Sequence, residues 1–280
     1  MAELAAIMGV PHNPLLWRTM GSSPVPDDLA RTRANFDRFA AAISDAEVDV
    51  LVVVGSDHLR QFHWGNSPAF CIGKAEQFTC TFENEIRTFG LDPCEMTGDP
   101  ELAGWLLGNA ELQPDIDFSM SNEWVLDHSF TIPAKFMTPT MSIPIVPIHT
   151  NANIPPIPRA ERYAALGRYL RRRIEQAPFR RRVALIASGH LATEIGGPRQ
   201  FLGGGSPDQE FDDAAVGWMK EGDIEGAVAG CTFERLAAAG NVTGQFLNFV
   251  TALAAADKPA SFAEGTPSRF ANGPFFWWDA

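Results

Sequence analysis

The sequence VDVLVVV, residues 48–54, is apolar at every position but one and is followed directly by Gly55 and Ser56. Two other short runs have the same character, IPIVPI at residues 143–148 and VALIA at residues 183–187. Continuous apolar runs of this length predict strands that are buried on both faces, as in parallel or mixed sheets covered by helices. Residues 4–9 form a weaker fourth candidate.

Helical patterns lie between these strands. Asp27-Asp28 precedes a stretch with apolar residues on one face, and Asp99-Pro100 places a capping residue before a proline at the first helical position. Pro158 is expected to open a helix that ends in arginines. Further helices are expected over residues 207–255, followed by an aromatic strand at residues 275–278. Strands that alternate with helices predict an α/β fold.

The expected architecture is a mixed, mostly parallel central sheet flanked by helices on both faces, with a helix-rich C-terminal third. The chain has 280 residues, of which 45% are hydrophobic, which is enough for a large core. No low-complexity linker divides it, so we expect a single domain over residues 1–280.

The formal net charge of −12 argues against nucleic acid or an anionic membrane surface as a partner, because both require clustered cations. The one basic run, at residues 168–173, falls at the end of an expected helix, where cations complement the helix dipole. The four cysteines show no C-x-x-C spacing. The N-terminal residues do not resemble a secretion signal, and no apolar stretch is long enough to span a bilayer. A reduced, cytoplasmic protein is therefore expected.

The positions of the six histidines are the most informative feature. Each of four follows or closes an expected strand: His12 in PHNP, His58 in GSDH, His149 after IPIVPI and His190 in ASGH. Ligands of open α/β sheets bind beyond the carboxyl ends of the strands. We therefore expect these four histidines to converge on one crevice, although a loop histidine taken alone more often satisfies backbone groups.

The remaining two histidines are less informative. His63, in QFHW, is expected at the surface or in packing, and His128, in LDHS, lies in an expected loop and is ambiguous by spacing alone. Two neutral imidazoles from separate loops suit Fe(II), Mn(II) or Zn(II). A catalytic site of this kind usually adds one carboxylate and leaves positions open for substrate.

Several short motifs occur in a fixed order along nearly the whole chain. They are HNPL at residues 12–15, SDH at 56–58, PAFCIG at 68–73, LDH at 126–128 with TIP at 131–133, VP at 146–147 with Asn151, SGH at 188–190, GPR at 197–199 and EFD at 210–212. In this ordered set the chain resembles the class III extradiol ring-cleavage dioxygenases, especially the catalytic (beta) subunit of protocatechuate 4,5-dioxygenase and the gallate dioxygenases.

The resemblance implies a role for each of four histidines. His12 and His58 match the two iron-binding histidines of the family, and His190 matches its acid/base histidine. His128 matches a second pocket histidine that contacts substrate or bound oxygen. The third iron ligand of the family is a glutamate in a pattern like G-N-x-T-x-E-I-x-N-W. Here the matching stretch is GNVTGQFLNF, residues 240–249, and Gln245 occupies the glutamate position.

Gln245 leaves several interpretations open. Its carbonyl oxygen can still act as a ligand but carries no charge, so the metal would be held less tightly. Alternatively a nearby acid, Asp208 or Glu210, replaces the glutamate, or the site binds no metal. A glutamine introduced in place of a native glutamate gives the same sequence.

Two further residues are candidates for supporting roles. Asp57, beside His58, either orients the imidazole ring or is an ordinary loop acid. Arg199, in GGPR, either meets a substrate carboxylate in a bidentate way or forms a structural ion pair.

The resulting hypothesis is a non-haem Fe(II)-dependent extradiol dioxygenase, with Mn(II) or Zn(II) as other candidate metals. It would use O2 to cleave a small catechol-type aromatic ring next to the diol, as in a dihydroxybenzoate, a trihydroxybenzoate or an aminophenol. The alternatives are a non-catalytic partner subunit that has lost its metal carboxylate and a metal-dependent hydrolase. A homodimer or higher oligomer is expected, with or without a second subunit.

Overall fold

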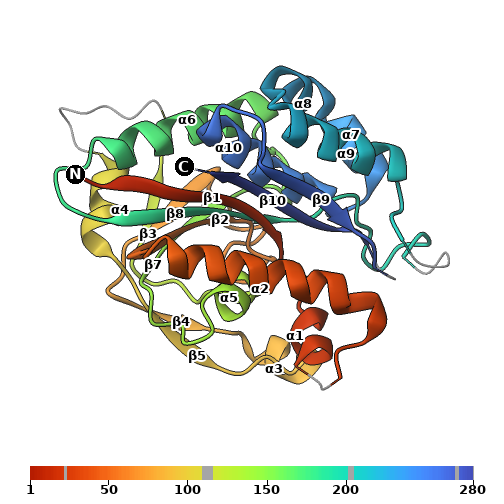
Figure 1. Ribbon diagram of the computed structural model, residues 1–280, viewed down its shortest axis with the longest axis horizontal. Coiled ribbons are helices and arrows are strands. Elements are labelled where there is room, and N and C mark those ends of the chain that lie inside the picture. The colour runs from red at the N-terminus through yellow and green to blue at the C-terminus, as the bar shows by residue number, and fades with distance from the viewer. Residues whose placement is uncertain (22–23, 109–115, 201–204, 269–270, 280) are drawn as a thin grey trace.

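A computed structural model describes residues 1–21, 24–108, 116–200, 205–268 and 271–279. Its main feature is an eight-stranded sheet in the order β6-β3-β7-β2-β8-β1-β10-β9 (Figure 1). The strands of this sheet are β1 (Glu3–Pro11), β2 (Val50–Gly55), β3 (Phe70–Gly73), β6 (Ser119–Ser121), β7 (Ile145–Thr150), β8 (Arg182–Gly189), β9 (Phe262–Thr266) and β10 (Gly273–Asp279). A separate two-stranded sheet consists of β4 (Gln77–Cys80) and β5 (Cys94–Thr97).

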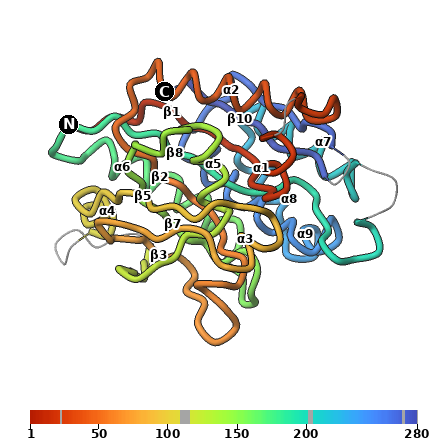
Figure 2. The backbone as a smooth tube through the Cα atoms, turned by 90° about the horizontal axis from the view of Figure 1, so that it is seen from below, coloured from red at the N-terminus to blue at the C-terminus, as the bar shows by residue number. Residues whose placement is uncertain are grey.

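The four central strands, β7, β2, β8 and β1, are parallel to one another. Antiparallel pairs join β3 to β7 on one side, and β10 to β1 and β9 on the other. The prediction of a mixed, mostly parallel central sheet is therefore confirmed. The first and last strands of the chain, β1 and β10, lie side by side, as the red and blue segments show in Figures 1 and 2.

Helices cover both faces of the sheet, as predicted. They are α1 (Leu15–Met20), η1 (Asp27–Leu29), α2 (Ala30–Asp45), α3 (Glu83–Phe89), α4 (Pro100–Leu107), α5 (His128–Met137), α6 (Ala160–Glu175), α7 (Gln209–Glu221), α8 (Ile224–Gly230), α9 (Phe233–Ala239), η2 (Thr243–Phe246) and α10 (Leu247–Ala256). None of the described helices is both long and apolar enough to cross a membrane.

Most of the apolar run at residues 48–54 forms β2, whose side chains contribute to two hydrophobic cores. Val50, Val52 and Val54 join a core with α4, α6 and α10, whereas Leu51 and Val53 join a core with α2 and α5. This division follows from the alternation of side chains along a strand. Burial on both faces explains why the run contains so few polar residues.

The sequence placed most of these elements well but not all of their ends. The arginine-ended helix begins at Ala160 and not at Pro158, because Arg159 is still extended. The aromatic residues at 275–278 form part of β10, and Phe275, Phe276 and Trp278 are buried in the cores. His128, which was expected in a loop, is the first residue of the buried helix α5, whose N-cap is Asp127.

Candidate metal centre and active site

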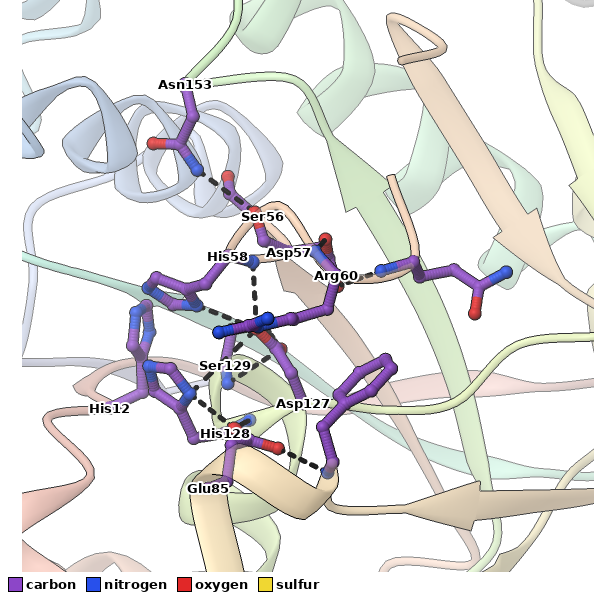
Figure 3. Close-up of polar contacts among 12 residues, drawn as sticks. His12, Ser56, Asp57, His58, Arg60, Glu85, Asp127, His128, Ser129 and Asn153 are labelled. Atoms are coloured by element: carbon purple, nitrogen blue, oxygen red, sulfur yellow. Dashed lines mark hydrogen bonds and ion pairs between the residues drawn. The ribbon is translucent and has the colours of Figure 1, made fainter. Parts of the chain in front are cut away.

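Four imidazole rings converge beyond the carboxyl ends of the parallel strands, and Figure 3 shows three of them, those of His12, His58 and His128. The ring centroid of His12 lies 5.1 Å from that of His58, 5.7 Å from that of His128 and 4.2 Å from that of His190. One coordinating nitrogen from each of His12, His58 and His190 falls within 4.8 Å of the others. The expected convergence of histidines at this edge therefore occurs, but with His128 in place of His149.

His12 follows the last residue of β1 and is fully buried. Its Nδ1 lies 2.8 Å from Ser188 Oγ, and that hydroxyl donates its only proton to the carbonyl of Ser129 at 2.6 Å. Ser188 must therefore accept a hydrogen bond from His12 Nδ1–H. The lone pair of His12 is then on Nε2, which is buried and has no hydrogen-bond partner among the described residues.

His58 is oriented in a similar way by a buried carboxylate. Its Nδ1 lies 2.7 Å from Asp127 Oδ2, which also accepts the backbone N–H of His58 at 2.9 Å. Burial raises the pKa of Asp127, but the charges and hydrogen bonds of His58, His128 and Ser129 outweigh this effect and hold that pKa well below its usual value. An ionised Asp127 fixes the proton of His58 on Nδ1 and leaves the lone pair on Nε2, the nitrogen that can bind a metal.

Asp127, and not Asp57, is thus the carboxylate that positions the His58 ring. The side chain of Asp57 accepts the backbone N–H groups of Arg60, Gln61 and Phe62 at 2.7, 3.2 and 3.1 Å. It therefore shapes the loop that follows β2 and does not contact the imidazole. The prediction for Asp57 chose the acid next to His58 in sequence, whereas the fold brings one from the N-terminus of α5.

Gln245 reaches the same point from the short helix η2. Its side chain is fully buried, with Nε2 3.2 Å from His58 Nε2 and 3.4 Å from Asn153 Oδ1. Its Oε1 has no hydrogen-bond partner among the described residues. A Cβ at Gly189 would lie 2.5 Å from the backbone oxygen of Gln245, so a glycine is required for η2 to pack this closely against the end of β8.

The donors present fit a transition metal. One ring nitrogen from each of His12 and His58 lies in a group of possible metal ligands, and the Gln245 amide adjoins this group through its Nε2, 3.2 Å from His58 Nε2. His12 Nε2 and Gln245 Oε1 are buried and have no hydrogen-bond partner in the described part of the chain. Buried polar atoms are nearly always satisfied in proteins, so unsatisfied atoms indicate a missing ligand. His12 and His58 could hold the metal together with a third donor, either the Gln245 amide oxygen or the His190 imidazole.

His190 lies beside this point, directly after β8. Burial, assisted by the neighbouring charges of His58 and His128, lowers its pKa to about 3. Its imidazole is therefore neutral at neutral pH and able to accept a proton. Both His190 and His58 line the cavity described below.

His128 is held by Glu85, a residue that the sequence analysis did not single out. Glu85 Oε1 accepts the backbone N–H of His128 at 2.8 Å and lies 2.6 Å from its Nδ1, and Oε2 accepts Phe82 N–H at 2.7 Å (Figure 3). The His128 ring stacks on His58, with centroids 3.9 Å apart. In the sequence, an acid in the first turn of a helix is indistinguishable from an ordinary capping residue.

His149 does not join the other histidines. It lies within β7 and not beyond its end, so its side chain is directed onto one face of the sheet. There its ring packs against Phe62 with a centroid separation of 4.2 Å, and its Nδ1 accepts the backbone N–H of Asp57 at 3.3 Å. His63 is exposed in the loop after β2, as expected.

The acids and the arginine considered as auxiliary residues lie elsewhere. Asp208 caps α7 and pairs with Arg235, and Glu210 is exposed in the first turn of α7. Neither belongs to a group of described residues that could hold a metal. The guanidinium of Arg199 is held by Glu194 at 2.6 Å and by the carbonyl of Ala238 at 2.8 Å. Arg199 is thus engaged in an ion pair, which was the second of its two interpretations.

A cavity of about 310 Å³ opens onto the histidines. Apolar side chains such as Leu15, Leu16 and Phe89 form part of its wall. Arg60 is the only lysine or arginine among the described residues that line it, and in Figure 3 its side chain extends toward His58. The cavity therefore combines an apolar wall, one cation and two imidazoles that are not needed as metal ligands.

Comparisons with known proteins identify the family of the chain. Residues 6–274 match the family model described as the catalytic LigB subunit of aromatic ring-opening dioxygenase. A 2,3-dihydroxyphenylpropionate/2,3-dihydroxicinnamic acid 1,2-dioxygenase from Rhodococcus jostii is 26% identical over 188 residues, which cover 67% of this chain and 56% of that protein. The enzyme of the same name from Comamonas testosteroni is 28% identical over 197 residues, which cover 68% and 56%.

The chain thus spans a little over half the length of the curated relatives it matches. Among solved structures, an uncharacterized protein, JW3007, from Escherichia coli K12 has the same fold, with a TM-score of 0.61 and 16% identity over 98% of this chain and 99% of that one. At this identity the likeness concerns the fold alone. Because the family model matches nearly the whole chain, the protein belongs to the family of catalytic LigB subunits of aromatic ring-opening dioxygenases.

Proposed function

We propose that this chain is an Fe(II)-dependent extradiol dioxygenase, which opens a catechol-type ring beside its two hydroxyls and adds both atoms of O2 to the product. The observation that carries the proposal is the pair of buried imidazoles, His12 and His58. Each has its Nδ1 proton fixed by a buried acceptor and its Nε2 directed at a common point beside Gln245. The family membership supports the same reaction class.

A bound Fe(II) would hold the ring and O2 next to each other and pass electrons between them. The chain supplies the remaining functions. Neutral His190 accepts a proton from a substrate hydroxyl, which allows the ring to bind as an anion. His128, held by Glu85 and stacked on His58, also lines the cavity and can return a proton. The apolar wall of the cavity excludes water from the ring.

The missing charge of the family glutamate is compensated only indirectly. Asp127 hydrogen bonds to His58 and places a negative charge behind that ligand, and no described acid replaces Gln245 itself. An anionic substrate would therefore supply the charge that the protein does not. This arrangement predicts a loosely held metal whose binding tightens with the substrate.

The neutral ligand also favours a second candidate function. A chain that has lost its metal carboxylate resembles a non-catalytic partner subunit, kept for assembly with an active relative. Gln245 is the observation in favour of this alternative. It differs from the first proposal in one measurable respect, since a partner subunit would bind no stoichiometric metal.

The deciding experiment is anaerobic reconstitution of the purified chain with Fe(II), followed by metal analysis and oxygen uptake with a panel of catechols. The panel includes protocatechuate, gallate, 2,3-dihydroxyphenylpropionate and an aminophenol. Oxygen uptake with a yellow ring-opened product is expected. Absence of both metal and uptake would favour the partner subunit, and activity without oxygen would contradict both candidates.

Restoring the family ligand is expected to tighten metal binding. In Gln245→Glu, the carboxylate adds a unit charge next to the metal, worth several kcal/mol at short range but offset by the cost of burying it. We expect Fe(II) to bind at least about tenfold more tightly, or ~1.4 kcal/mol. Isothermal titration under anaerobic conditions measures this. The matched control is Gln176→Glu, at an exposed position at the end of α6, and equal affinities for both variants would remove Gln245 from the ligand set.

Removing the negative charge of Asp127, which hydrogen bonds to His58, is expected to weaken metal binding. In Asp127→Asn, the amide can still accept the ring proton but no longer favours a strongly basic imidazole, and such changes cost about 10- to 100-fold in metal affinity. The same titration measures the loss. Asp45→Asn, at an exposed position at the end of α2, serves as the control. Unchanged affinity in Asp127→Asn would mean that His58 is not a ligand.

We further propose that the substrate is a catechol carrying a carboxylate, which pairs with Arg60. The names of the two relatives identify substrates of this class. Among the described residues, Arg60 makes a hydrogen bond through its backbone N–H and none through its guanidinium, which leaves that group available to the cavity that it lines. This assignment replaces the one made for Arg199, whose guanidinium is already paired.

Substitution of this cation should therefore affect carboxylated substrates selectively. In Arg60→Gln, loss of a charged hydrogen bond of about 1.5–3 kcal/mol should raise KM for a carboxylated catechol about tenfold or more. Steady-state oxygen uptake measures KM, and unsubstituted catechol is the internal control, for which no change is expected. An equal rise in KM for both substrates would show that Arg60 acts on the loop and not on the carboxylate.

A further inference from the structure

Two cysteines face each other outside the proposed active site. Cys80, the last residue of β4, is paired with Cys94, the first residue of β5, in antiparallel register. Residues paired in this way have Cα atoms about 4.5–5.5 Å apart. A disulfide requires about 4.4–6.8 Å. The backbone of the two strands therefore already has the spacing that a cross-strand disulfide needs.

The two thiols differ in a way that suits an exchange reaction. Cys80 is 1% exposed, and its Sγ can donate to the carbonyl of Phe78 at 3.6 Å or to the facing sulfur of Cys94. Cys94 is only partly buried, so small oxidants can reach it. The hydrogen bond from Cys80 lowers the pKa of Cys94 to about 6 against the opposing effect of burial, and Lys135 adds to the lowering. At neutral pH, Cys94 is thus the nucleophile and Cys80 the resolving thiol.

We propose that Cys80 and Cys94 form a reversible thiol–disulfide pair that responds to peroxides. The Cys94 thiolate attacks one peroxide oxygen, the O–O bond breaks, and a sulfenic acid forms as water or an alcohol leaves. The Cys80 thiol then attacks the Cys94 sulfur, which forms the S–S bond and releases a second water. Two thiols are oxidised and one peroxide is reduced. A dithiol reductant reverses the reaction.

The position of this pair links it to the proposed active site on two sides. Thr79 and Thr81, which flank Cys80, exchange hydrogen bonds with the backbone of Leu126 at 2.9 and 2.8 Å. Leu126 directly precedes Asp127 and His128. Beyond Cys80, the chain continues into α3 and Glu85, which holds the His128 ring. A covalent bond at Cys80 therefore restrains both partners of the His128–Glu85 pair. This part of the inference rests on the proposed function.

The chemistry is tested without reference to activity. The purified chain is treated with hydrogen peroxide and then denatured, and its free thiols are titrated. Titratable thiols are expected to fall from four to two, to recover with dithiothreitol, and to give a linked pair of peptides containing Cys80 and Cys94. Cys71, buried in the core, provides the matched control, since Cys71→Ser should leave the linked peptides unchanged and Cys94→Ser should abolish them. Sulfinic acid on Cys94 with Cys80 still free, or four thiols after treatment, would overturn the proposal.

The link to the active site is tested by oxygen uptake of the reduced, oxidised and re-reduced chain. We expect a several-fold decrease on oxidation, full recovery on reduction, and no response in Cys94→Ser. A disulfide that forms without any change in uptake would contradict the link while leaving the pair intact. If no form takes up oxygen, the proposed function fails, and the thiol titration still decides the chemistry on its own.

Discussion

The variant His12→Ala is expected to lose stoichiometric Fe(II) and all measurable oxygen uptake. His12 offers a buried Nε2 with no other partner among the described residues, and this lone pair is lost with the imidazole. Loss of a direct ligand should exceed the about 10- to 100-fold cost of removing a residue that only supports one. Metal analysis after anaerobic reconstitution and gel filtration measures the loss, with oxygen uptake on the same sample.

Folding must be separated from metal binding in this experiment. Removal of the imidazole leaves Ser188 with an unused acceptor in the core, which costs about 1–3 kcal/mol of unfolding free energy. Circular dichroism and the midpoint of urea unfolding report that change. His63→Ala, at an exposed position in the loop after β2, is the control and should behave as wild type. A folded His12→Ala chain with full metal content would refute the assigned ligand set.

The variant His190→Gln is expected to keep its metal and lose most of its turnover. Its neutral imidazole is positioned to accept the substrate proton, and removal of a general base typically costs about 10²- to 10⁴-fold in rate. We expect kcat to fall by this factor and the Fe(II) affinity to change little. Single-turnover mixing of the anaerobic enzyme–substrate complex with O2 measures the step directly.

Two results would contradict this assignment. Loss of metal in His190→Gln would make His190 a ligand, which is possible because its ring nitrogen lies in the same group as those of His12 and His58. Wild-type turnover in His190→Gln would mean that His128, and not His190, accepts the substrate proton. The parallel variant His128→Gln separates these cases, because it removes the second imidazole of the cavity without touching the first.

The convergence of His12, His58 and His190 could be predicted from the sequence because each lies within three residues of the end of an apolar strand. The carboxyl ends of parallel strands meet at one edge, so a pattern that identifies the strands also brings these residues together. The same reasoning failed for His149, because the sequence does not show whether a histidine is the last residue inside a strand or the first residue beyond it. His149 lies inside β7. One residue of register decides which face or edge a strand side chain reaches.

The residues that support the histidines were largely beyond prediction from sequence. Asp127 reaches His58 from another element, and Glu85 reaches His128 from α3. The spacing of these residues along the chain does not indicate such contacts, because the contacts depend on how the helices pack against the sheet. Asp57 and Arg199 were chosen by proximity in sequence or by motif, and the structure engages both in local contacts.

The pairing of β1 with β10 has a consequence for how the protein matures. During synthesis, the strand that leads to His12 emerges long before β10, one of its two neighbours in the sheet, and also long before Gln245. In a ribosome-bound nascent chain, His12 and His58 are therefore present long before Gln245 has been synthesised. If the proposed ligand set is right, the metal would bind only after translation, because an ion that arrived earlier would meet an incomplete site.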